Sequence, residues 1–311
     1  MSPADESPPR SAVAIVGLGS IGGGAACVLR LADRHDIVAC ARRPLERLAF
    51  EGPQGAVDVP LRVLTDPADA RPADWVLLCT KTHETQSAAP WLARLCGPST
   101  RVAVMQNGID HAGRVAPYAG GATVVPVLVY YNGERLAADR VRLTPVGDWD
   151  LVVPDDATGR EFIRLFEGTK LRIVASADFI TLAWRKLLLN VSANPVTSLT
   201  LQRQSVLRRP DIQALCLAIL DEAVACGRAE GARLGPDESA RAIAMLMSFS
   251  PGLGTSMYFD RLAGRKLEIE ALNGAVVASG ERHGIPTPIN RALLALLRAV
   301  SEAADGGGNA G

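Results

Sequence analysis

The sequence lacks an excess of charge of either sign, because its 311 residues include 33 lysines and arginines and 33 aspartates and glutamates. Nucleic-acid-binding domains usually carry a marked excess of basic residues, so we expect no nucleic-acid partner. The sequence also lacks a continuous apolar run of membrane-spanning length, since five glycines interrupt the first apolar stretch between residues 17 and 24. We therefore expect no membrane segment. The polar, proline-rich residues 1–10 lack the order of a secretory signal and are predicted to be a disordered lead.

Cysteine and histidine spacings typical of metal or redox sites are also missing. The six cysteines form no C-x-x-C pair, and most lie in apolar runs, where a free thiol packs as a small hydrophobic group. The four histidines are scattered, without the spacing of a zinc site. We expect no metal, and we expect the buried, reduced thiols of a cytoplasmic protein.

Short apolar runs alternate with helix-like segments in the first half of the chain. A run without polar alternation is typical of a strand buried on both faces in a parallel sheet that helices cover. The runs cover residues 13–16, 37–40, 75–79 and 102–105. We therefore predict an α/β fold with a Rossmann-type doubly wound sheet. Further strand-like stretches cover residues 123–131, 141–143 and 150–153, and the last two are predicted to be added strands that could be antiparallel.

Helical periodicity replaces this pattern beyond about residue 176. The expected helices cover residues 179–192, 211–230, 238–249, 266–283 and 289–303. Two domains follow, a dinucleotide-binding domain over residues 11–175 and an all-helical domain over 176–303, with a flexible tail at 304–311. The apolar helix faces permit a homodimer.

A glycine loop follows the first predicted strand. Gly17, Gly19 and Gly22 form the pattern G-x-G-x-x-G between that strand and a helix-like run. In this setting the first glycine permits a tight turn, the second lets a pyrophosphate approach the backbone, and the third lets helix and strand pack closely. The helix N-terminus then favours an anion. We predict a dinucleotide site rather than an incidental turn, with these contacts: Gly17, Leu18, Gly19, Ser20, Ile21 and Gly22.

The residues after the second predicted strand indicate which dinucleotide binds. A site for NAD usually places an Asp or Glu there for the ribose 2′-hydroxyl, whereas this chain has Arg42 and Arg43. A guanidinium can bind a 2′-phosphate through two hydrogen bonds. We therefore predict NADP(H), with Arg42 as the better candidate. The alternative is a solvated arginine pair.

Polar residues also follow the third and fourth predicted strands. Lys81 follows the third strand and Asn107 the fourth. Ligands bind beyond the carboxyl ends of the strands in such sheets, so we predict a binding role for both residues. The alternatives are a surface charge at Lys81 and a simple turn at Asn107.

A polar stripe crosses the first helix of the second half. Lys186, Asn190 and Asn194 are spaced at i, i+4 and i+8 among leucines, which places them on one helix face. A buried amide without a partner costs about 1–3 kcal/mol. The stripe therefore indicates either a ligand or a polar contact between helices.

Together these features resemble the ketopantoate reductase family (2-dehydropantoate 2-reductases), of the 6-phosphogluconate-dehydrogenase-like superfamily. One part of the resemblance is W-R-K-L-x-x-N-x-x-x-N-P, from Trp184 to Pro195, after a Rossmann-type half. A second is the stretch 255–274, from T-S-M-Y-F-D through A-G-R and E-I-E to L-N-G. With the glycine loop, Lys81 and Gln106-Asn107-Gly108, the resemblance covers nearly the whole chain.

The resemblance implies NADPH-dependent reduction of 2-dehydropantoate to (R)-pantoate, a step towards pantothenate and coenzyme A. It implies that Lys186 is the general acid and that Glu268, like Lys81 and Asn107, lies beside the cofactor. It implies substrate contacts for four residues: Asn107, Asn190, Asn194 and Ser256. The chemistry is sensible in itself, because hydride addition to a ketone creates an alkoxide that a cationic donor stabilises and protonates.

Three positions depart from the common pattern of this family. Tyr258 and Phe259 stand where a leucine and a polar residue are usual, and Asn132 stands near a usually small residue. Bulky rings beside the pocket would reshape it. Two alternatives therefore accompany the prediction: a related reductase of another 2-oxo acid or ketone, and a non-catalytic regulator that senses NADP(H).

Overall fold

The structure is a computed structural model that describes residues 10–53 and 55–306. Its contacts divide the chain into two compact units, described separately below. The sheet unit comprises Met1–Gln106 and His111–Phe179, and the helical unit comprises Asn107–Asp110 and Ile180–Gly311. The change at Phe179 comes slightly after the expected boundary at residue 175. The grouping of Asn107–Asp110 with the helices was not anticipated.

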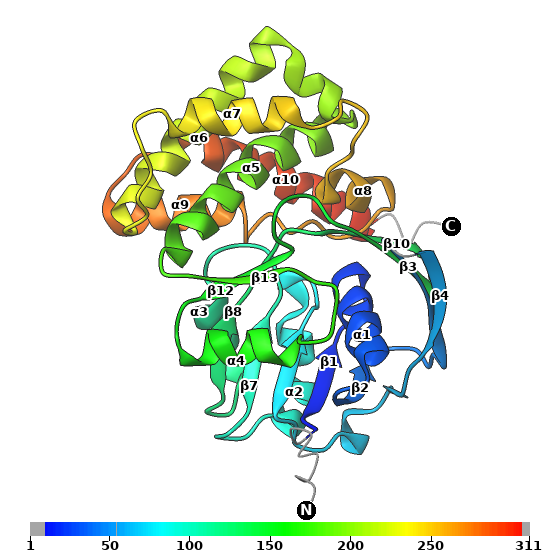
Figure 1. The fold of residues 1–311 in the computed structure, drawn as a ribbon. Coiled ribbons are helices and arrows are strands. Elements are labelled where there is room, and N and C mark those ends of the chain that lie inside the picture. The colour runs from blue at the N-terminus through cyan, green and yellow to red at the C-terminus, as the bar shows by residue number, and fades with distance from the viewer. Residues whose placement is uncertain (1–9, 54, 307–311) are drawn as a thin grey trace, which may run out of the picture. The chain divides into compact units, whose positions relative to one another are not determined.

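The sheet unit contains a six-stranded parallel sheet (Figure 1), which confirms the predicted fold class. In spatial order its strands are β5 (Val63–Leu64), β2 (Asp36–Cys40), β1 (Ala12–Val16), β6 (Trp75–Leu78), β7 (Arg101–Val104) and β8 (Thr123–Pro126). The strand order reverses between β1 and β6. In open α/β sheets ligands bind at such a switch point, beyond the carboxyl ends of the strands. The glycine loop follows β1, and Lys81 follows β6 closely.

Both faces of this sheet are buried, as its apolar runs predict. Alternate residues of β1 belong to different cores: Val13 and Ile15 pack with residues of α1 and α4, whereas Ala14 and Val16 pack with residues of α2 and α3. The α-helices of this unit are α1 (Ser20–Ala32), α2 (Ala89–Leu95), α3 (His111–Val115) and α4 (Ala157–Leu165). Its 3₁₀ helices are η1 (Pro67–Asp69), η2 (Thr82–Glu84), η3 (Gln86–Ala88) and η4 (Ala116–Tyr118).

A four-stranded sheet, most of which the sequence analysis missed, packs on the outer side of α1 (Figure 1). Its order is β10 (Asn132–Ala137), β11 (Arg140–Thr144), β3 (Arg47–Gly52) and β4 (Gly55–Pro60). A Cβ atom at Gly23 would lie 2.9 Å from the Val141 side chain, and one at Gly24 would lie 3.2 Å from that of Leu143. The glycines after the loop therefore let α1 fit between two sheets.

The stretch expected as one strand at residues 123–131 is two strands in different sheets. Its first part is β8, and its second part, β9 (Leu128–Val129), joins a three-stranded sheet of order β13-β12-β9. The other strands there are β12 (Leu151–Pro154) and β13 (Ile173–Ser176). The stretches expected as added, possibly antiparallel strands at residues 141–143 and 150–153 are strands of two different sheets. Strand β11 is antiparallel to β10 and parallel to β3, and β12 is antiparallel to β9 and parallel to β13.

The helical unit is built from six α-helices over its described residues up to 306. They are α5 (Phe179–Thr200, whose first residue closes the sheet unit), α6 (Pro210–Ala229), α7 (Glu238–Ser248), α8 (Ser256–Leu262), α9 (Asn273–His283) and α10 (Pro288–Gly306), with the 3₁₀ helix η5 (Gln204–Arg208) between α5 and α6. Trp184, Leu187 and Val191 place one side of α5 in the main core of this unit. Arg185 attaches α5 to α7, because its Nε donates to Oε1 of the buried Glu238 over 2.8 Å.

Two helix predictions need correction. Residues 266–283 are not one helix: α9 begins only at Asn273, and α8 precedes it. Between the two helices, the consecutive residues Leu267, Glu268 and Ile269 are all buried but lie outside any helix, so the apolar residues there belong to a buried segment without regular secondary structure. Helix α5 also continues beyond the expected end at residue 192 and contains Pro195.

At the chain ends, the predicted lead and tail lie mostly outside the described residues. Arg10, the last residue of the predicted lead, bonds to Asp33 and Asp36, and α10 continues to Gly306. Within the described part of the chain, no helix is long and apolar enough to cross a membrane. No group of three His, Cys, Asp or Glu side chains that could hold a metal ion occurs among residues 10–53 and 55–306.

Candidate active site

The glycine loop has the geometry that its pattern predicts. Gly17 has φ +97°, and a Cβ atom there would lie 2.9 Å from the backbone nitrogen of Thr80. A Cβ at Gly22 would lie 2.0 Å from the carbonyl oxygen of Gly17. A Cβ at Gly19, by contrast, would meet no atom within 4 Å. The loop is thus closed behind Gly17 and Gly22 and open over Gly19, which fits a phosphate approaching the start of α1.

Two residues of the second half of the sheet unit hold this loop from outside. The hydroxyl of Tyr131 donates to the carbonyl of Ile21 over 3.2 Å, and the guanidinium of Arg135 donates to the carbonyl of Leu18. Leu18 is buried. Both donors lie more than a hundred residues from the loop in sequence. No sequence motif marks either residue, so their contacts with the loop could not be predicted from the sequence.

Arg42 lies just after β2, and its side chain is 91% exposed. Its guanidinium is 3.4 Å from a carboxylate oxygen of Glu84 in η2. Lys81 precedes η2 directly and is partly buried. The ends of β2 and β6 thus bring Arg42 and the turn after Lys81 together. An exposed guanidinium there is free of tight packing, so it can turn towards an anion.

Gln106 organises the turn after β7. It is 4% exposed, and its Nε2 donates to the carbonyl and the hydroxyl of Thr80, each over 3.0 Å. Its Oε1 accepts from Nε of Arg114 over 3.1 Å. Because Thr80 also contacts Gly17, Gln106 supports the glycine loop from behind. Gln106 belongs to the motif Gln106-Asn107-Gly108, from which no role for it was predicted.

In the helical unit, Asn107 joins two charged residues. Its Oδ1 accepts a hydrogen bond from Nζ of Lys186 over 3.2 Å, and its Nδ2 donates to Oε2 of Glu268 over 3.2 Å. Lys186 is on α5, and Glu268 is in the buried segment between α8 and α9. Three predicted site residues that are far apart in sequence therefore form one hydrogen-bonded chain.

The protonation of Lys186 is shifted by this setting. Burial lowers the pKa of Lys186 from its ordinary 10.5 to about 8, and the negative charge of Glu268 opposes part of that shift. A lysine with this pKa is still mostly protonated at neutral pH, yet it gives up its proton more easily than a solvated lysine. Lys186 is thereby suited to donate a proton to a developing alkoxide.

Asn190 and Asn194 continue the stripe on α5, as predicted. Asn194 is 4% exposed and Asn190 is partly buried. Over the described residues, neither side-chain amide makes a hydrogen bond, whereas the neighbouring Ser192 hydroxyl donates to the carbonyl of Leu188 over 2.8 Å. Two amides without protein partners favour a ligand role over the alternative of a contact between helices.

Ser256 is the first residue of α8 and is exposed. Thr255 caps this helix by accepting from the backbone N–H of Tyr258 over 3.2 Å, and its hydroxyl shares a 2.7 Å hydrogen bond with that of Thr197. Thr197 is one turn beyond Asn194 on α5. This hydrogen bond therefore fixes the start of α8, with Ser256, to the end of the polar stripe.

Tyr258 and Phe259, the aromatic residues that follow Ser256, pack against each other, and the guanidinium of Arg203 lies over both rings. The rings of Tyr258 and Phe259 have centroids 5.2 Å apart, and the guanidinium of Arg203 lies 5.7 and 5.8 Å from them. Tyr258 is buried, whereas Phe259 is 42% exposed. The two rings that depart from the pattern of the resembled family thus lie close to Ser256 in sequence, and Phe259 is partly on the surface.

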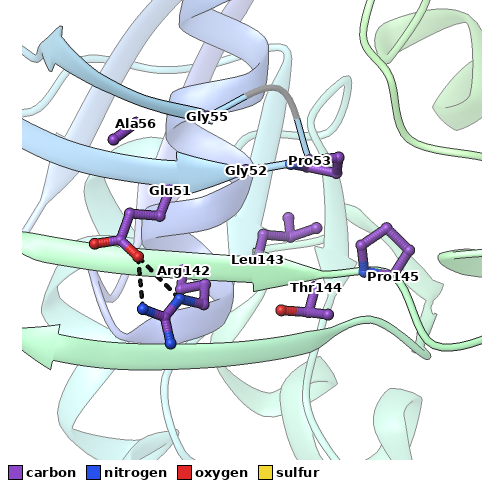
Figure 2. A pocket seen from close by; sticks show the side chains of 9 residues that line it. All are labelled: Glu51, Gly52, Pro53, Gly55, Ala56, Arg142, Leu143, Thr144 and Pro145. Carbon is purple, nitrogen blue, oxygen red and sulfur yellow. Dashed lines mark hydrogen bonds and ion pairs between the residues drawn. The ribbon is translucent and has the colours of Figure 1, made fainter.

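A hollow of about 310 Å³ lies elsewhere in the sheet unit, on β3, β4 and β11 (Figure 2). Glu51 and Arg142 are among the residues that line it, and their side chains form an ion pair over 2.7 Å. None of the predicted site residues lines it. The hollow contributes nothing to the candidate site.

The predicted residues divide between the two units. The sheet unit holds the glycine loop, Arg42 and Lys81, and the helical unit holds the rest of the set, which is Asn107, Lys186, Asn190, Asn194, Ser256 and Glu268. The sheet unit supplies groups suited to a dinucleotide. The helical unit supplies a cation, a carboxylate and several amides, which suit a polar carbonyl compound and proton transfer to it.

Comparison with protein families finds two matches that together cover most of the chain. Residues 13–153 match the model described as "Ketopantoate reductase PanE/ApbA", and residues 178–301 match "Ketopantoate reductase PanE/ApbA C terminal". The boundary between the two models lies near the change of unit at Phe179.

Curated relatives agree with the family models. A 2-dehydropantoate 2-reductase of Caulobacter vibrioides is 38% identical over 294 residues, which are 94% of this chain and 99% of that protein. One of Mycobacterium tuberculosis is 36% identical over 294 residues, covering 93% and 98% of the two chains.

Solved structures agree as well. The PanE/ApbA family ketopantoate reductase of Ralstonia eutropha is 29% identical with a TM-score of 0.85, covering 94% of this chain and 99% of that one. A dimeric ketopantoate reductase of Staphylococcus aureus is 26% identical with a TM-score of 0.83 and the same coverage. D-mandelate dehydrogenase, solved with NADH and anilino(oxo)acetate, shares the fold at 18% identity and a TM-score of 0.82, over 94% of this chain and 99% of that one.

Proposed function

Because the chain belongs to the ketopantoate reductase family, we propose that it reduces ketopantoate to (R)-pantoate with Lys186 as the proton donor and NADPH as the source of hydride. The chain is an oxidoreductase that acts on a CH–OH/C=O pair, and its reaction is a step in pantothenate biosynthesis. The observation that carries the assignment of roles is the chain of hydrogen bonds from Lys186 through Asn107 to Glu268.

The cofactor is a nicotinamide dinucleotide, and its phosphates would bind over Gly19 at the start of α1. The open space over Gly19 supports this, as does the lack of acidic residues in the first turn of the helix. Arg42 would bind the 2′-phosphate of NADPH in place of its present partner Glu84. A 2′-phosphate carries more charge than one carboxylate and accepts two hydrogen bonds from a guanidinium, so it would compete well for Arg42.

Lys186 would be the residue that transfers the proton. As charge develops on the C2 oxygen of the acid, the Nζ of Lys186 would donate a hydrogen bond and then a proton to that oxygen. Asn107 orients Nζ by accepting one of its hydrogens, which leaves the others for the substrate. Glu268 keeps the lysine protonated until then, because its charge raises the pKa of Lys186 against the effect of burial.

The remaining polar residues would hold the 2-oxo acid. Asn190 and Asn194 present their amides on the Lys186 face of α5. Ser256 would donate to the substrate carboxylate from the start of α8, where the helix end favours a negative charge. Holding the acid by several groups at once makes hydride and proton transfer nearly unimolecular.

The oligomeric state and the cellular location are also part of the proposed function. We propose a homodimer, because a related ketopantoate reductase at 26% identity is described as dimeric. We propose a cytoplasmic location, because all six cysteines are free thiols, as a reducing compartment maintains them.

The test is the rate of NADPH oxidation with ketopantoate and with a panel of other 2-oxo acids. We expect the highest kcat/KM with ketopantoate, and a loss of about 10²-fold or more in kcat for Lys186→Met. The control is Lys170→Met, which removes an exposed lysine of the sheet unit. Turnover confined to other acids would refute the substrate. NADPH binding without turnover of any acid would favour a regulator.

A further inference from the structure

Pro195 interrupts the hydrogen bonding of α5. A proline has no N–H, so the carbonyl four residues earlier, that of Val191, loses its helical donor, and the proline ring pushes against it. Val191 is fully buried. A buried carbonyl without a donor is rare and costly, so the structure must satisfy it in another way.

Asn273 supplies the missing donor. It is the first residue of α9, its side chain is fully buried, and its Nδ2 donates to the carbonyl oxygen of Val191 over 3.2 Å. The same Nδ2 donates to Oδ1 of Asn290 over 2.9 Å. One amide nitrogen thus bonds the opened turn of α5 to a residue of α10.

The far end of this network is anchored firmly. Nδ2 of Asn290 donates to Oε2 of Glu222 over 2.7 Å and to the carbonyl of Ile219 over 3.1 Å, both on α6. Glu222 also accepts from the backbone N–H groups of Ile289 and Asn290, each over 2.9 Å. Asn273 therefore has little freedom, because α6 and α10 fix the group that it contacts.

The opened turn of α5 carries the polar stripe. Val191 follows Asn190 directly and Pro195 follows Asn194 directly, so the interrupted turn is the one that separates the two asparagines. A change in this turn would rotate one amide relative to the other. The position of Asn273 therefore bears on the geometry of both.

We propose that Asn273 is a positioning residue for the reduction: through the Val191 carbonyl it holds the proline-opened turn of α5 in the one shape that aims Asn190 and Asn194 at the 2-oxo acid. This inference rests on the proposed substrate roles of the two asparagines. Asn273 itself bonds to α5 and α10 and acts through them.

If Asn273 had a purely structural role, it would bond to the Val191 carbonyl without affecting catalysis. A second variant separates this structural role from the proposed positioning role. Pro195→Ala returns an N–H that can bond to the Val191 carbonyl in an ordinary helix. It thereby removes the need for Asn273 as a donor, but it also removes the opened turn. Pro195→Ala is therefore expected to preserve stability while it changes the geometry of the turn.

The experiment compares Asn273→Leu, Pro195→Ala and the double variant, with Ser279→Ala as the control. Ser279 is fully buried on the same helix and bonds to Glu230 instead of α5. The measurements are Tm, kcat and KM for the acid, and Kd for NADPH. We expect Asn273→Leu to lower Tm and to lower kcat/KM for the acid about ten-fold or more, with Kd for NADPH unchanged.

The double variant should recover part of the lost Tm, because the Val191 carbonyl regains a donor whereas Oδ1 of Asn290 does not, but it should not recover kcat/KM. Pro195→Ala alone should keep Tm and lose kcat/KM for the acid. Ser279→Ala should lower Tm only. Wild-type kcat/KM in Asn273→Leu, or recovery of both quantities in the double variant, would overturn the proposal. If Asn273→Leu does not fold, Pro195→Ala decides, because wild-type kcat/KM there overturns the proposal equally.

Failure of the proposed function gives a different result. A wild-type protein that reduces no 2-oxo acid removes the premise and refutes both proposals. A wild-type protein that reduces ketopantoate, together with variants that match it in kcat/KM, refutes only the role of Asn273.

Discussion

Lys186 donates from its Nζ to Oδ1 of Asn107 over 3.2 Å, although the two residues are 79 positions apart. The pair joins the middle of α5 to the loop after β7. An amide oxygen is a neutral acceptor, so it orients the ammonium group without strongly raising its pKa. The lysine is held in place and yet remains a good acid, which is the combination that proton donation requires.

The pH dependence of kcat/KM should report the protonation of Lys186. The proposed proton donation needs protonated Lys186, so kcat/KM for ketopantoate should be constant at lower pH and fall with a midpoint near its pKa of about 8. In Glu268→Gln the midpoint should move to lower pH, because the charge that raises the pKa is gone. An unchanged midpoint in Glu268→Gln would contradict the assignment, and Glu270→Gln, which removes an exposed carboxylate paired with Arg298, is the control.

Stability should depend on pH through the same group. Between about pH 8 and 10.5 the unfolded lysine is protonated and the folded one is not, so the unfolded state binds more protons and the free energy of unfolding rises with pH. The expected rise is about 1–3 kcal/mol. It is measured as the difference between wild type and Lys186→Met in urea denaturation at pH 7 and pH 10. Because cysteines and tyrosines titrate in both proteins, only this difference isolates the lysine, and no difference would refute the shifted pKa.

Two glycines of the loop should respond in opposite ways to alanine. Gly19→Ala should leave Tm near that of wild type, since a Cβ there meets nothing within 4 Å, but should weaken NADPH binding about ten-fold or more by filling the phosphate space. Gly22→Ala should cost about 1–3 kcal/mol or more of stability, because its Cβ would lie 2.0 Å from a carbonyl oxygen. Calorimetry for Tm and fluorescence titration for NADPH check both. Normal NADPH binding by Gly19→Ala would place the phosphates elsewhere.

Cofactor choice should depend on Arg42. Arg42→Ala should weaken NADPH binding about ten-fold or more and NADH binding little, because only NADPH carries the 2′-phosphate. Its Tm should not change, since a 91% exposed guanidinium paired over 3.4 Å contributes little to folding. Arg71→Ala, an exposed arginine before β6, is the matched control. Equal losses for NADPH and NADH would refute the role of Arg42.

A change at the start of α8 should weaken binding of the acid and leave binding of the cofactor unchanged. Thr255→Val removes the helix cap and the hydrogen bond to Thr197, so it should cost about 0.5–2 kcal/mol of stability and raise KM for ketopantoate by displacing Ser256. Thr200→Val removes only a bond to a carbonyl of its own helix and serves as the control. A wild-type KM in Thr255→Val would separate Ser256 from substrate binding.

The elements that could be predicted from the sequence were those marked by a local pattern of residues. The strands of the parallel sheet are apolar because helices cover both faces, and the i, i+4 spacing of Lys186, Asn190 and Asn194 survives in α5 as one stripe. The β3–β4 hairpin gave no such signal. Its alternation is weak, and its burial comes from packing on α1, which no local pattern of residues 47–60 expresses.

The sequence by itself determined the class of fold, the glycine loop and the list of chemically capable residues, because turn geometry, strand burial and helix periodicity are all local properties of the chain. Only the tertiary structure decided how those residues act on one another. It joins Asn107 to Lys186 and Glu268, lowers the pKa of Lys186 through burial, and provides the Val191 carbonyl with a donor from Asn273. These effects depend on distances between distant segments and on exclusion of water, which exist only once the chain has folded.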